Sequence, residues 1–300
     1  MNEHKSGKTP GLSADEEQEV SHNQPPRAAV LHEIIRAQGD KELQRTIAAL
    51  WWSALAAGLT MGLSLMAMGL FYARLPDGDS SQVIASLGYS AGFLAVILAR
   101  QQLFTENTLT AVLPVMTKPT LNNAGRLLRL WGVVLFGNLV GTVLVSYVML
   151  HLPIFDSKTD LAFLEVGRKV MQNEIGQMFA KGIISGWMIA TMVWMIPSME
   201  NARIWIILLI TYLMALGDFT HIVVGSVEVS YLAWAGEVSW QQFWLHFAGP
   251  TLAGNIVGGS FIFALISHAQ IRSDAGLPDG TLSKGRERPL PGRRDPTDAP

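Results

Sequence analysis

Six long apolar stretches dominate the middle of the chain, and polar stretches flank them on both sides. Each is close to the ~20 residues that a helix needs to cross a bilayer, so the pattern predicts membrane-spanning helices. Their expected bounds are 46–72, 83–116, 124–150, 178–197, 203–234 and 244–269. The pattern therefore predicts an all-α membrane protein with six transmembrane helices.

Polar residues interrupt the second and fifth of these stretches. The first interruption covers 100–107, and the second covers 217–221. Each contains Phe-Thr followed by an ionisable residue, Glu106 in one and His221 in the other. Irregular backbone at membrane depth is tolerated only where it is buried in protein or lines a water-filled cavity. Transporters place their binding sites at such broken helices. We therefore expect helices two and five to be broken and the breaks to line one pore.

The two halves of the chain carry matching motifs in matching order. A glycine pair at 58–62 in the first stretch matches one at 182–186 in the fourth. Gly-Asn-Leu-Val-Gly at 137–141 in the third matches Gly-Asn-Ile-Val-Gly at 254–258 in the sixth. Because each half has three spans, the second half enters the membrane from the opposite side. The motifs thus predict an inverted 3+3 repeat, which brings the two breaks together.

Charge in the 300-residue chain gathers at its two ends. Only 15% of residues are charged and 49% are hydrophobic, against about 25% charged in soluble domains. Lys and Arg are concentrated on the side that holds both termini, which predicts that both termini are cytoplasmic. The chain has no cysteine, which excludes disulfides and thiolate metal sites. No apolar region follows the N-terminus, so no cleavable signal peptide is expected.

These patterns divide the chain into four parts. We expect a disordered cytoplasmic tail at 1–26 and another at 272–300, because both are polar and rich in Pro, Gly or charge. Apolar residues at helical spacing beside basic residues predict an amphipathic helix at 27–45. That helix lies either in the membrane interface or against the underside of the membrane domain. The six-helix channel domain occupies 46–271.

The motifs resemble those of the formate/nitrite transporter family. The similar features are Leu-Phe-Thr at the first break, a lone His at the second, and Gly-Asn-x-x-Gly in the third and sixth spans. The resemblance covers about 28–272, and the runs 99–107 and 217–228 are most similar to the YfdC-like inner-membrane branch. It implies an aquaporin-like fold, a homopentamer, a bacterial inner-membrane location and a pore for small monovalent anions in each protomer.

The chain departs from the formate and nitrite channels at two positions. Glu106 stands where they have a small residue, and Thr220 stands where they have Glu before the central His. The differences bear on anion specificity rather than on the fold.

His221 is the first candidate for the pore. Ionisable residues inside a membrane are expensive and usually face the bundle interior, and imidazole titrates near neutral pH. The resemblance implies that this His takes part in protonating the anion, which then crosses as the neutral acid. The alternative is a buried His whose ring nitrogens are satisfied by Thr and Asn side chains and which only fixes helix packing.

Glu106 is the second candidate, because the matched Phe-Thr motifs make it the pseudo-symmetry mate of His221. We hypothesise that its carboxylate holds the imidazole and also repels anions. Arg100 is an alternative partner that would neutralise Glu106, and contacts that merely close the broken helix are a further alternative.

The remaining candidates surround the breaks. Lys181 either attracts anions in a vestibule, as the resemblance implies, or extends to the membrane interface. Uncharged hydrogen-bonding groups at the pore are Thr105 and Thr220. The expected constriction, which excludes hydrated ions by dewetting, consists of Leu103, Phe104 and Phe219. Residues expected to support the helix breaks are Asn107, Asn138, Asn255 and Asp218.

The leading functional hypothesis is a channel or proton-linked transporter for a small monovalent weak-acid anion of the formate or nitrite kind, or for its neutral acid. Alternatives are a pore for a different small or neutral solute, and a non-conducting membrane scaffold in which Glu106 blocks anions. An enzyme is disfavoured because Gly-x-Ser-Gly, His-Glu-x-x-His and cysteine nucleophiles are lacking. No cofactor, metal or nucleic acid is implied; the expected partners are lipid, a small solute or ion, and further copies of the chain.

Overall fold

The computed structural model of this chain describes residue 13 and residues 26–76 and 78–275. These residues form helices and connecting loops, with no strand among them. The predicted tails at 1–26 and 272–300 fall almost wholly outside the described part. Three α-helices of the first half are α2 (Ala28–Gln44), α3 (Ile47–Tyr72) and α7 (Leu121–His151). Between α3 and α7 lie α4 (Asp79–Ala85), η1 (Ser86–Tyr89), α5 (Ser90–Leu98), η2 (Glu106–Thr108) and α6 (Val112–Thr117).

The second half also consists of helices. It contains α8 (Ser157–Met171), α9 (Ile175–Met195), η3 (Ile196–Ser198), η4 (Glu200–Ala202), α10 (Arg203–Leu216) and α11 (Ile222–Trp234). A last run consists of α12 (Trp240–Gln242), η5 (Phe243–Ala248), α13 (Gly249–Ile256), η6 (Val257–Ala264) and α14 (Leu265–Ala275). Both η5 and η6 have π-helical hydrogen bonding, and Pro250, which has no amide N–H to donate, follows η5 closely.

Within the described residues, five helical runs are long and apolar enough to cross a membrane. They are Ile47–Tyr72, Ser80–Leu98, Leu121–His151, Ile175–Ser198 and Trp240–Ser273. The fifth predicted span is divided between the two shorter helices α10 and α11. The second was predicted as 83–116, but its helix begins earlier and already reaches membrane length at Leu98. Most of the polar run 100–107 therefore follows a complete span.

The helices that precede the two breaks, α5 and α10, end in the same way. After α5, Arg100 has a φ of 54°, and the Gln101 N–H donates to the Val96 carbonyl at 3.0 Å. After α10, Asp218 has a φ of 50°, and the Phe219 N–H donates to the Met214 carbonyl at 3.0 Å. A residue with positive φ, followed by a backbone hydrogen bond that reaches back five residues, closes a helix end. Glycine usually fills the position with positive φ. Arg100 and Asp218 are thus equivalent positions.

The long helices form two groups that make the same contacts. In the first group α3 packs along α7, and in the second α9 packs along α13 and η6. A Cβ on Gly58 would lie 2.2 Å from the Asn138 carbonyl oxygen, and one on Gly186 would lie 2.3 Å from that of Asn255. Glycine at both positions lets the backbones approach this closely. Gly58 is therefore equivalent to Gly186, one helical turn away from the predicted match of 58–62 with 182–186.

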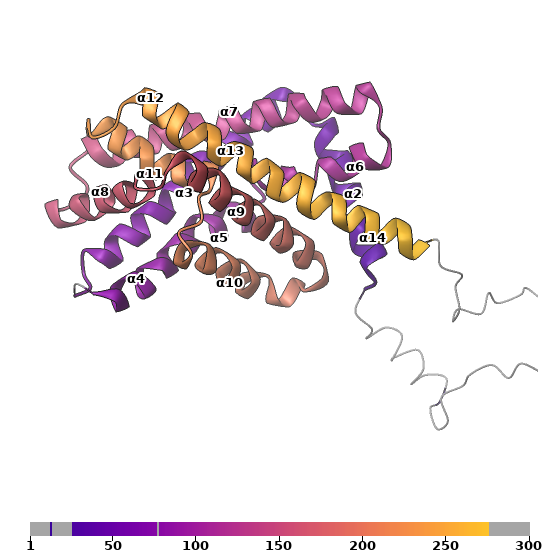
Figure 1. Cartoon of the computed structure of the whole chain (residues 1–300), viewed down its shortest axis with the longest axis horizontal. Helices are drawn as coiled ribbons and strands as arrows, with labels where there is room; N and C mark the ends of the chain where they lie inside the picture. Colours follow the sequence, from indigo (N-terminus) through magenta and orange to yellow (C-terminus); the bar gives the residue numbers. More distant parts are fainter. Residues whose placement is uncertain (1–12, 14–25, 77, 276–300) are drawn as a thin grey trace, which may run out of the picture.

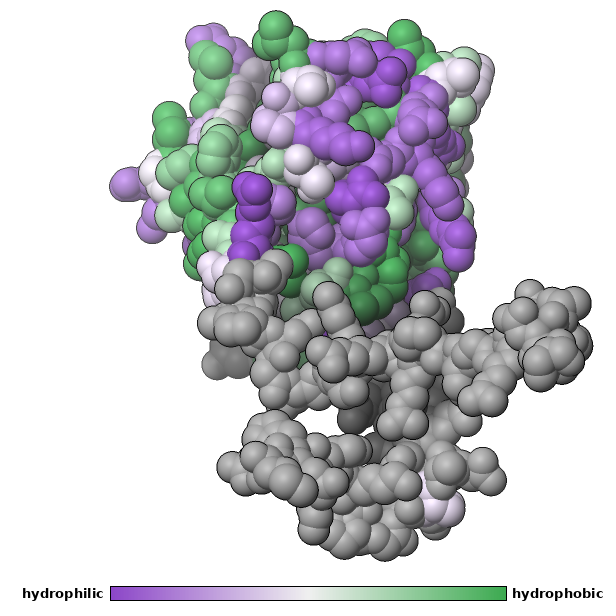
Figure 2. Space-filling model, turned by 90° about the vertical axis from the view of Figure 1, so that its right-hand side faces the viewer, coloured by the Kyte–Doolittle hydropathy of each residue, from purple (hydrophilic) through white to green (hydrophobic). Residues whose placement is uncertain are grey.

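The amphipathic pattern at 27–45 forms α2. Its apolar residues Leu31, Ile35 and Leu43 are buried, and the helix packs against α6, α7, α9 and α14. Helices α2 and α14 meet at the right-hand end of the molecule in Figure 1. Polar residues cover much of that end in Figure 2, with hydrophobic residues mainly at its margins. The helix thus packs against the membrane domain, while a position in the membrane interface stays a prediction.

A histidine pair links α2 to α14. The ring nitrogens His32 Nε2 and His268 Nδ1 are 3.2 Å apart, and the His32 ring lies edge-on to Trp194. One ring must be neutral at the shared contact for a hydrogen bond to form. Burial, with a contribution from His268, lowers the pKa of His32 from its ordinary value of 6.5. Lowering the pH below that value therefore weakens the docking of α2.

We expect the backbone amides of α2 to be less protected, relative to the intrinsic exchange rate at each pH, at about pH 5 than at about pH 8, because protonation of His32 weakens its contact with His268. Hydrogen exchange followed by mass spectrometry in detergent would measure this. His32→Gln is the control, since it keeps a hydrogen-bonding side chain that does not titrate. Equal pH dependence in both proteins would contradict a role for His32.

Candidate functional site

His221 joins the two breaks. Its Nε2 atom lies 2.8 Å from the Thr105 hydroxyl, which belongs to the first break. Its Nδ1 atom accepts long hydrogen bonds of 3.3 Å from the Val223 and Val224 amides, so the side chain caps the N-terminus of α11. Because Nδ1 accepts, the neutral ring carries its proton on Nε2 and donates it to Thr105. The imidazole is 1% exposed, and Phe93 lies edge-on to it.

Two asparagines support the breaks with equivalent hydrogen bonds. Asn138 Oδ1 accepts from the Phe104 N–H at 2.9 Å, while its Nδ2 donates to the carbonyls of Ala54 and Gln102. Asn255 Oδ1 accepts from the Ile222 N–H at 2.9 Å, while its Nδ2 donates to the carbonyls of Gly182 and Thr220. Both asparagines are fully buried. They satisfy backbone groups that a broken helix leaves without partners.

These asparagine contacts fix how the two halves correspond. Phe104 is equivalent to Ile222, and Leu103 is therefore equivalent to His221. The equivalence of Arg100 with Asp218 gives the same alignment. The predicted pairing of Glu106 with His221 is thus displaced by three residues. It followed the Phe-Thr motif, whereas the structure aligns the backbone groups that the asparagines bind.

Glu106 lies apart from the imidazole. Thr105 occupies the position beside His221 that was assigned to Glu106. Within the described residues the Glu106 carboxylate forms no hydrogen bond or ion pair, and the charged group that acts on it is Glu42 of α2. Glu42 in turn accepts from Gln102 Nε2 at 2.8 Å. The carboxylate therefore lies towards the end of the molecule where α2 packs. Arg100 is exposed and does not neutralise it.

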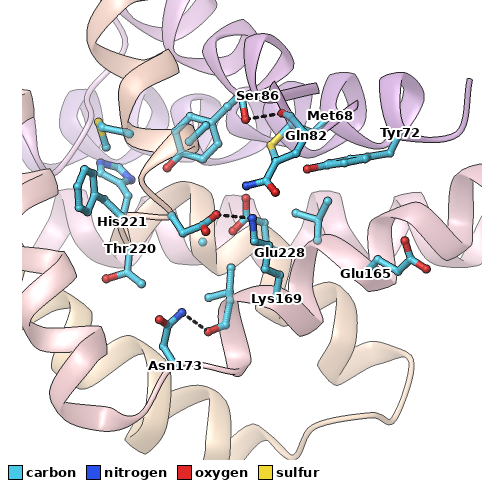
Figure 3. Close-up of a pocket in the computed structure, with 18 of the residues that line it drawn as sticks. Met68, Tyr72, Gln82, Ser86, Glu165, Lys169, Asn173, Thr220, His221 and Glu228 are labelled. Atoms are coloured by element: carbon cyan, nitrogen blue, oxygen red, sulfur yellow. Dashed lines mark hydrogen bonds and ion pairs between the residues drawn. The ribbon is translucent and has the colours of Figure 1, made fainter. Parts of the chain in front are cut away.

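A cavity of about 290 Å³ reaches His221 from the opposite side. Residues from α3, α4, η1, α8 and the loop after it, α10, the second break, α11 and η5 line it, including Tyr72, Gln82, Tyr89, Asn173 and Phe247. In Figure 3, His221 and Thr220 lie at one end of the cavity and Glu165 and Tyr72 at the other, with Lys169 and Glu228 between them. Because His221 is buried and Glu165 is exposed, the cavity deepens towards the break. We call it the vestibule.

The lysine of the vestibule is Lys169. Its Nζ atom lies 2.7 Å from the Asp218 carboxylate, at the end of α10. Lys181 is half-buried in α9 and is not among the vestibule-lining residues. Asp218 thus belongs to the vestibule as well as to the helix break.

The expected constriction residues occupy different places. Phe219 lines the vestibule, whereas Leu103 and Phe104 are buried in the first break and do not line it. The Phe104 ring lies edge-on to Trp131 at a centroid distance of 5.7 Å. Asn107 donates to the Leu103 carbonyl at 3.1 Å and to Gln102 Oε1 at 3.0 Å, which supports the loop as expected.

The vestibule includes residues that the sequence analysis missed, chiefly Lys169 and Glu228. Lys169 belongs to α8, a helix absent from the six predicted spans. The signal for α8 was present: apolar residues at 162, 163, 166 and 170 recur at helical spacing behind the capping residue Asp156. Glu228 lies in the run 217–228, which was used only as evidence for the resemblance to the family. Its position two turns beyond His221 on one helix face could have singled it out.

Comparison with known proteins identifies the family. Residues 29–269 match the model of the family described as "Formate/nitrite transporter". The chain belongs to the formate/nitrite transporter family. This family comprises membrane transporters and channels rather than enzymes, and the expected relationship to YfdC is confirmed. The chain is 58% identical to "Inner membrane protein YfdC" of Escherichia coli over 250 residues, which cover 83% of this chain and 81% of that protein.

Two solved structures show that this formate/nitrite transporter family member has the family fold. "Pentameric formate channel with formate bound" superposes with a TM-score of 0.62 at 21% identity and covers 76% of this chain and 98% of its own. "FNT family ion channel" superposes with a TM-score of 0.65 at 19% identity and covers 81% and 96%. At these identities the superpositions establish the fold, and with it the all-α membrane architecture predicted from the sequence.

Proposed function

We propose that this chain forms a channel or proton-linked transporter for a small monovalent weak-acid anion of the formate or nitrite kind, or for its neutral acid. The pore runs between the two breaks, with His221 as a proton relay. The protein assembles as a homopentamer in the bacterial inner membrane with both termini in the cytoplasm. Family membership and the inner-membrane location of the 58% identical relative support this proposal.

The contact between His221 and Thr105 is the observation that carries the proposal. It joins the two breaks at the deep end of the vestibule, and Leu103 and Phe104, the two residues before Thr105, are buried and do not line the vestibule. A solute that reaches this end therefore meets an imidazole and a hydroxyl before it enters the buried apolar part of the first break. An anion that gains a proton there enters the apolar passage uncharged, which greatly reduces the cost of desolvation.

The proton balance of this step is simple. Neutral His221 takes up a proton at Nδ1 and releases the Val223 and Val224 amides. The imidazolium then passes its Nε2 proton to Thr105, whose hydroxyl proton passes to the anion. The products are the neutral acid and a neutral imidazole with its proton on Nδ1, and uptake of a proton at Nε2 followed by loss of the Nδ1 proton restores the starting form. Thr220 positions this assembly, because its hydroxyl donates to the Met178 carbonyl and its own carbonyl accepts from Ser185 and Asn255.

His221→Asn and His221→Ala should both abolish the pH dependence of weak-acid flux, because neither side chain exchanges a proton. Formate uptake into proteoliposomes across a pH gradient measures this. Asn is a good helix N-cap and Ala is not, so the free energy of unfolding of the Ala variant should be about 1 kcal/mol lower than that of the Asn variant. Intact pH coupling in both variants would remove His221 from the relay.

A pore for another small or neutral solute, or a scaffold that does not conduct, is the second candidate. The observation that favours it is the pair of carboxylates Glu42 and Glu106, which oppose anions at the α2 end of the molecule. Parallel assays with formate, nitrite, hydrosulfide, acetate and glycerol separate these possibilities. Flux of formate or nitrite supports the proposal, flux of glycerol alone supports a neutral-solute pore, and no flux of any solute supports the scaffold.

A further inference from the structure

Glu228 is a second buried acid in the vestibule. It lies seven residues after His221, which places the two side chains near one face of α11. The residue is 4% exposed, lines the vestibule, and forms no hydrogen bond or ion pair with any described residue. Burying an unpaired carboxylate costs free energy, so a carboxyl group in such a place is stabilised by binding a proton or a ligand.

The surroundings of Glu228 contain one cation. Lys169 from α8 and Asp218 from the second break lie close enough to Glu228 to interact with it electrostatically. The ion pair between Lys169 and Asp218 uses one of the three N–H donors of the lysine. The other ionisable groups that line the vestibule are Tyr72 of α3, Tyr89 of η1, Glu165 of α8 and His221. Lys169 is therefore the group that can hold an anion beside Glu228.

Glu228 and His221 differ in how they are bound. Both ring nitrogens of His221 form hydrogen bonds with protein groups, whereas no described residue forms a hydrogen bond with the Glu228 carboxyl group. A molecule that enters the vestibule therefore meets an available acid before it reaches the occupied imidazole. Figure 3 shows this order, with Glu228 and Lys169 between the Glu165 end and His221.

We propose that Lys169 docks the weak-acid anion in the vestibule and that Glu228 exchanges a proton with it. This inference rests on the proposed function and assigns to Glu228 the protonation of anions that are docked in the vestibule, while His221 protonates anions that reach it still charged. The Glu228 O–H bond breaks and its proton forms an O–H bond with the docked anion, leaving the neutral acid and a glutamate. Lys169 stabilises that glutamate until a proton from the solution outside the vestibule restores it. The neutral acid then moves on past His221 without a second proton transfer.

Formate uptake into proteoliposomes tests the proposal, with internal pH followed by an entrapped dye. Glu228→Gln keeps the size and polarity of the side chain and removes its proton; it should lower uptake at acidic external pH about ten-fold and flatten the pH profile. Lys169→Met should raise the formate concentration needed for half-maximal uptake. Glu33→Gln, on the exposed face of α2 and outside the vestibule, is the control and should keep the wild-type profile. An unchanged profile in Glu228→Gln beside a pH-dependent wild type overturns the proposal and leaves the proposed function standing.

A second measurement does not depend on transport. Infrared difference spectra of the purified protein, with and without formate, report the C=O stretch of a protonated buried carboxyl group. We expect formate to change a carboxyl band that is present in the wild type and in Glu33→Gln and missing in Glu228→Gln. A difference spectrum that is identical in wild type and Glu228→Gln overturns the assignment even if wild-type flux is zero, a result that would separately remove the proposed function.

Discussion

Asn255→Leu is expected to abolish transport and to lower thermal stability. Asn255 Oδ1 is the acceptor for the Ile222 amide at the start of α11, and leucine has a similar volume without that acceptor. The Thr220 carbonyl keeps a donor in the Ser185 hydroxyl, and the Gly182 carbonyl lies within helix α9, so the Ile222 amide is the group left unpaired. A buried unpaired amide costs about 1–3 kcal/mol, and more where lipid excludes water.

The functional effect should exceed the effect on stability. The Asn255 side chain fixes the backbone on both sides of His221, so its loss displaces the imidazole from Thr105. We expect at least a hundred-fold loss of flux with a fall in melting temperature of about 4–8 °C. Flux assays and detergent melting curves measure these quantities. Asn138→Leu should behave alike, because Asn138 makes the equivalent bonds in the first half.

Asn122→Leu is the matched control for both changes. Asn122 is exposed in the first turn of α7, and the same substitution there should leave flux and melting temperature near those of the wild type. Wild-type flux in Asn255→Leu would show that the break does not need its asparagine, and the pore account would lose its structural basis.

At alkaline pH, where an unpaired buried carboxyl group ionises, removing Glu106 should increase anion flux about ten-fold, in both Glu106→Gln and Glu106→Gly. The carboxylate forms no hydrogen bond or ion pair within the described residues, and it lies near Glu42 on the α2 side of the first break. Two unit charges about 5 Å apart repel or attract with about 3 kcal/mol at an effective dielectric constant of about 20. Water at the pore mouth screens part of this, and about 1.4 kcal/mol at the barrier corresponds to the ten-fold change.

Formate and nitrite flux at fixed pH, measured over a range of salt concentrations, would test the Glu106 prediction. The gain should shrink as salt rises, because screening already weakens the repulsion in the wild type. Glu33→Gln removes an exposed carboxylate from α2 and should change flux little. Unchanged or reduced flux in both Glu106 variants would reject the idea that this carboxylate opposes anions.

Much of the candidate site could be predicted from the sequence, because its chemistry follows from residues that are out of place in a bilayer. His221, Asn138 and Asn255 were identified because a polar side chain inside an apolar span is costly to bury and usually serves function or supports the structure. The arrangement of those residues was harder to predict. A repeated motif suggested that Glu106 faces His221, yet the asparagine bonds align Leu103 with His221. Motif similarity records the residue types, whereas the partners of backbone N–H groups set the register.

The vestibule shows the same limit. Lys181 was singled out by resemblance, while Lys169 reaches the cavity from α8, a helix between two spans. Hydropathy windows detect long apolar stretches and pass over a short amphipathic helix whose apolar face is narrow. Glu228 lies in an apolar run, and only its tertiary neighbours show that its carboxyl faces a cavity.

The sequence by itself determined the all-α membrane class, the approximate spans and the family, because the length of apolar runs and the polar residues within them are local properties that a bilayer constrains strongly. Only the tertiary structure decided which groups meet: Thr105 with His221, Asn255 with Ile222, and Lys169 with Asp218. These contacts join segments far apart in the chain. The contacts depend on how closely the glycine-containing helices pack and on where each backbone break falls. The local pattern of residues predicts neither of these.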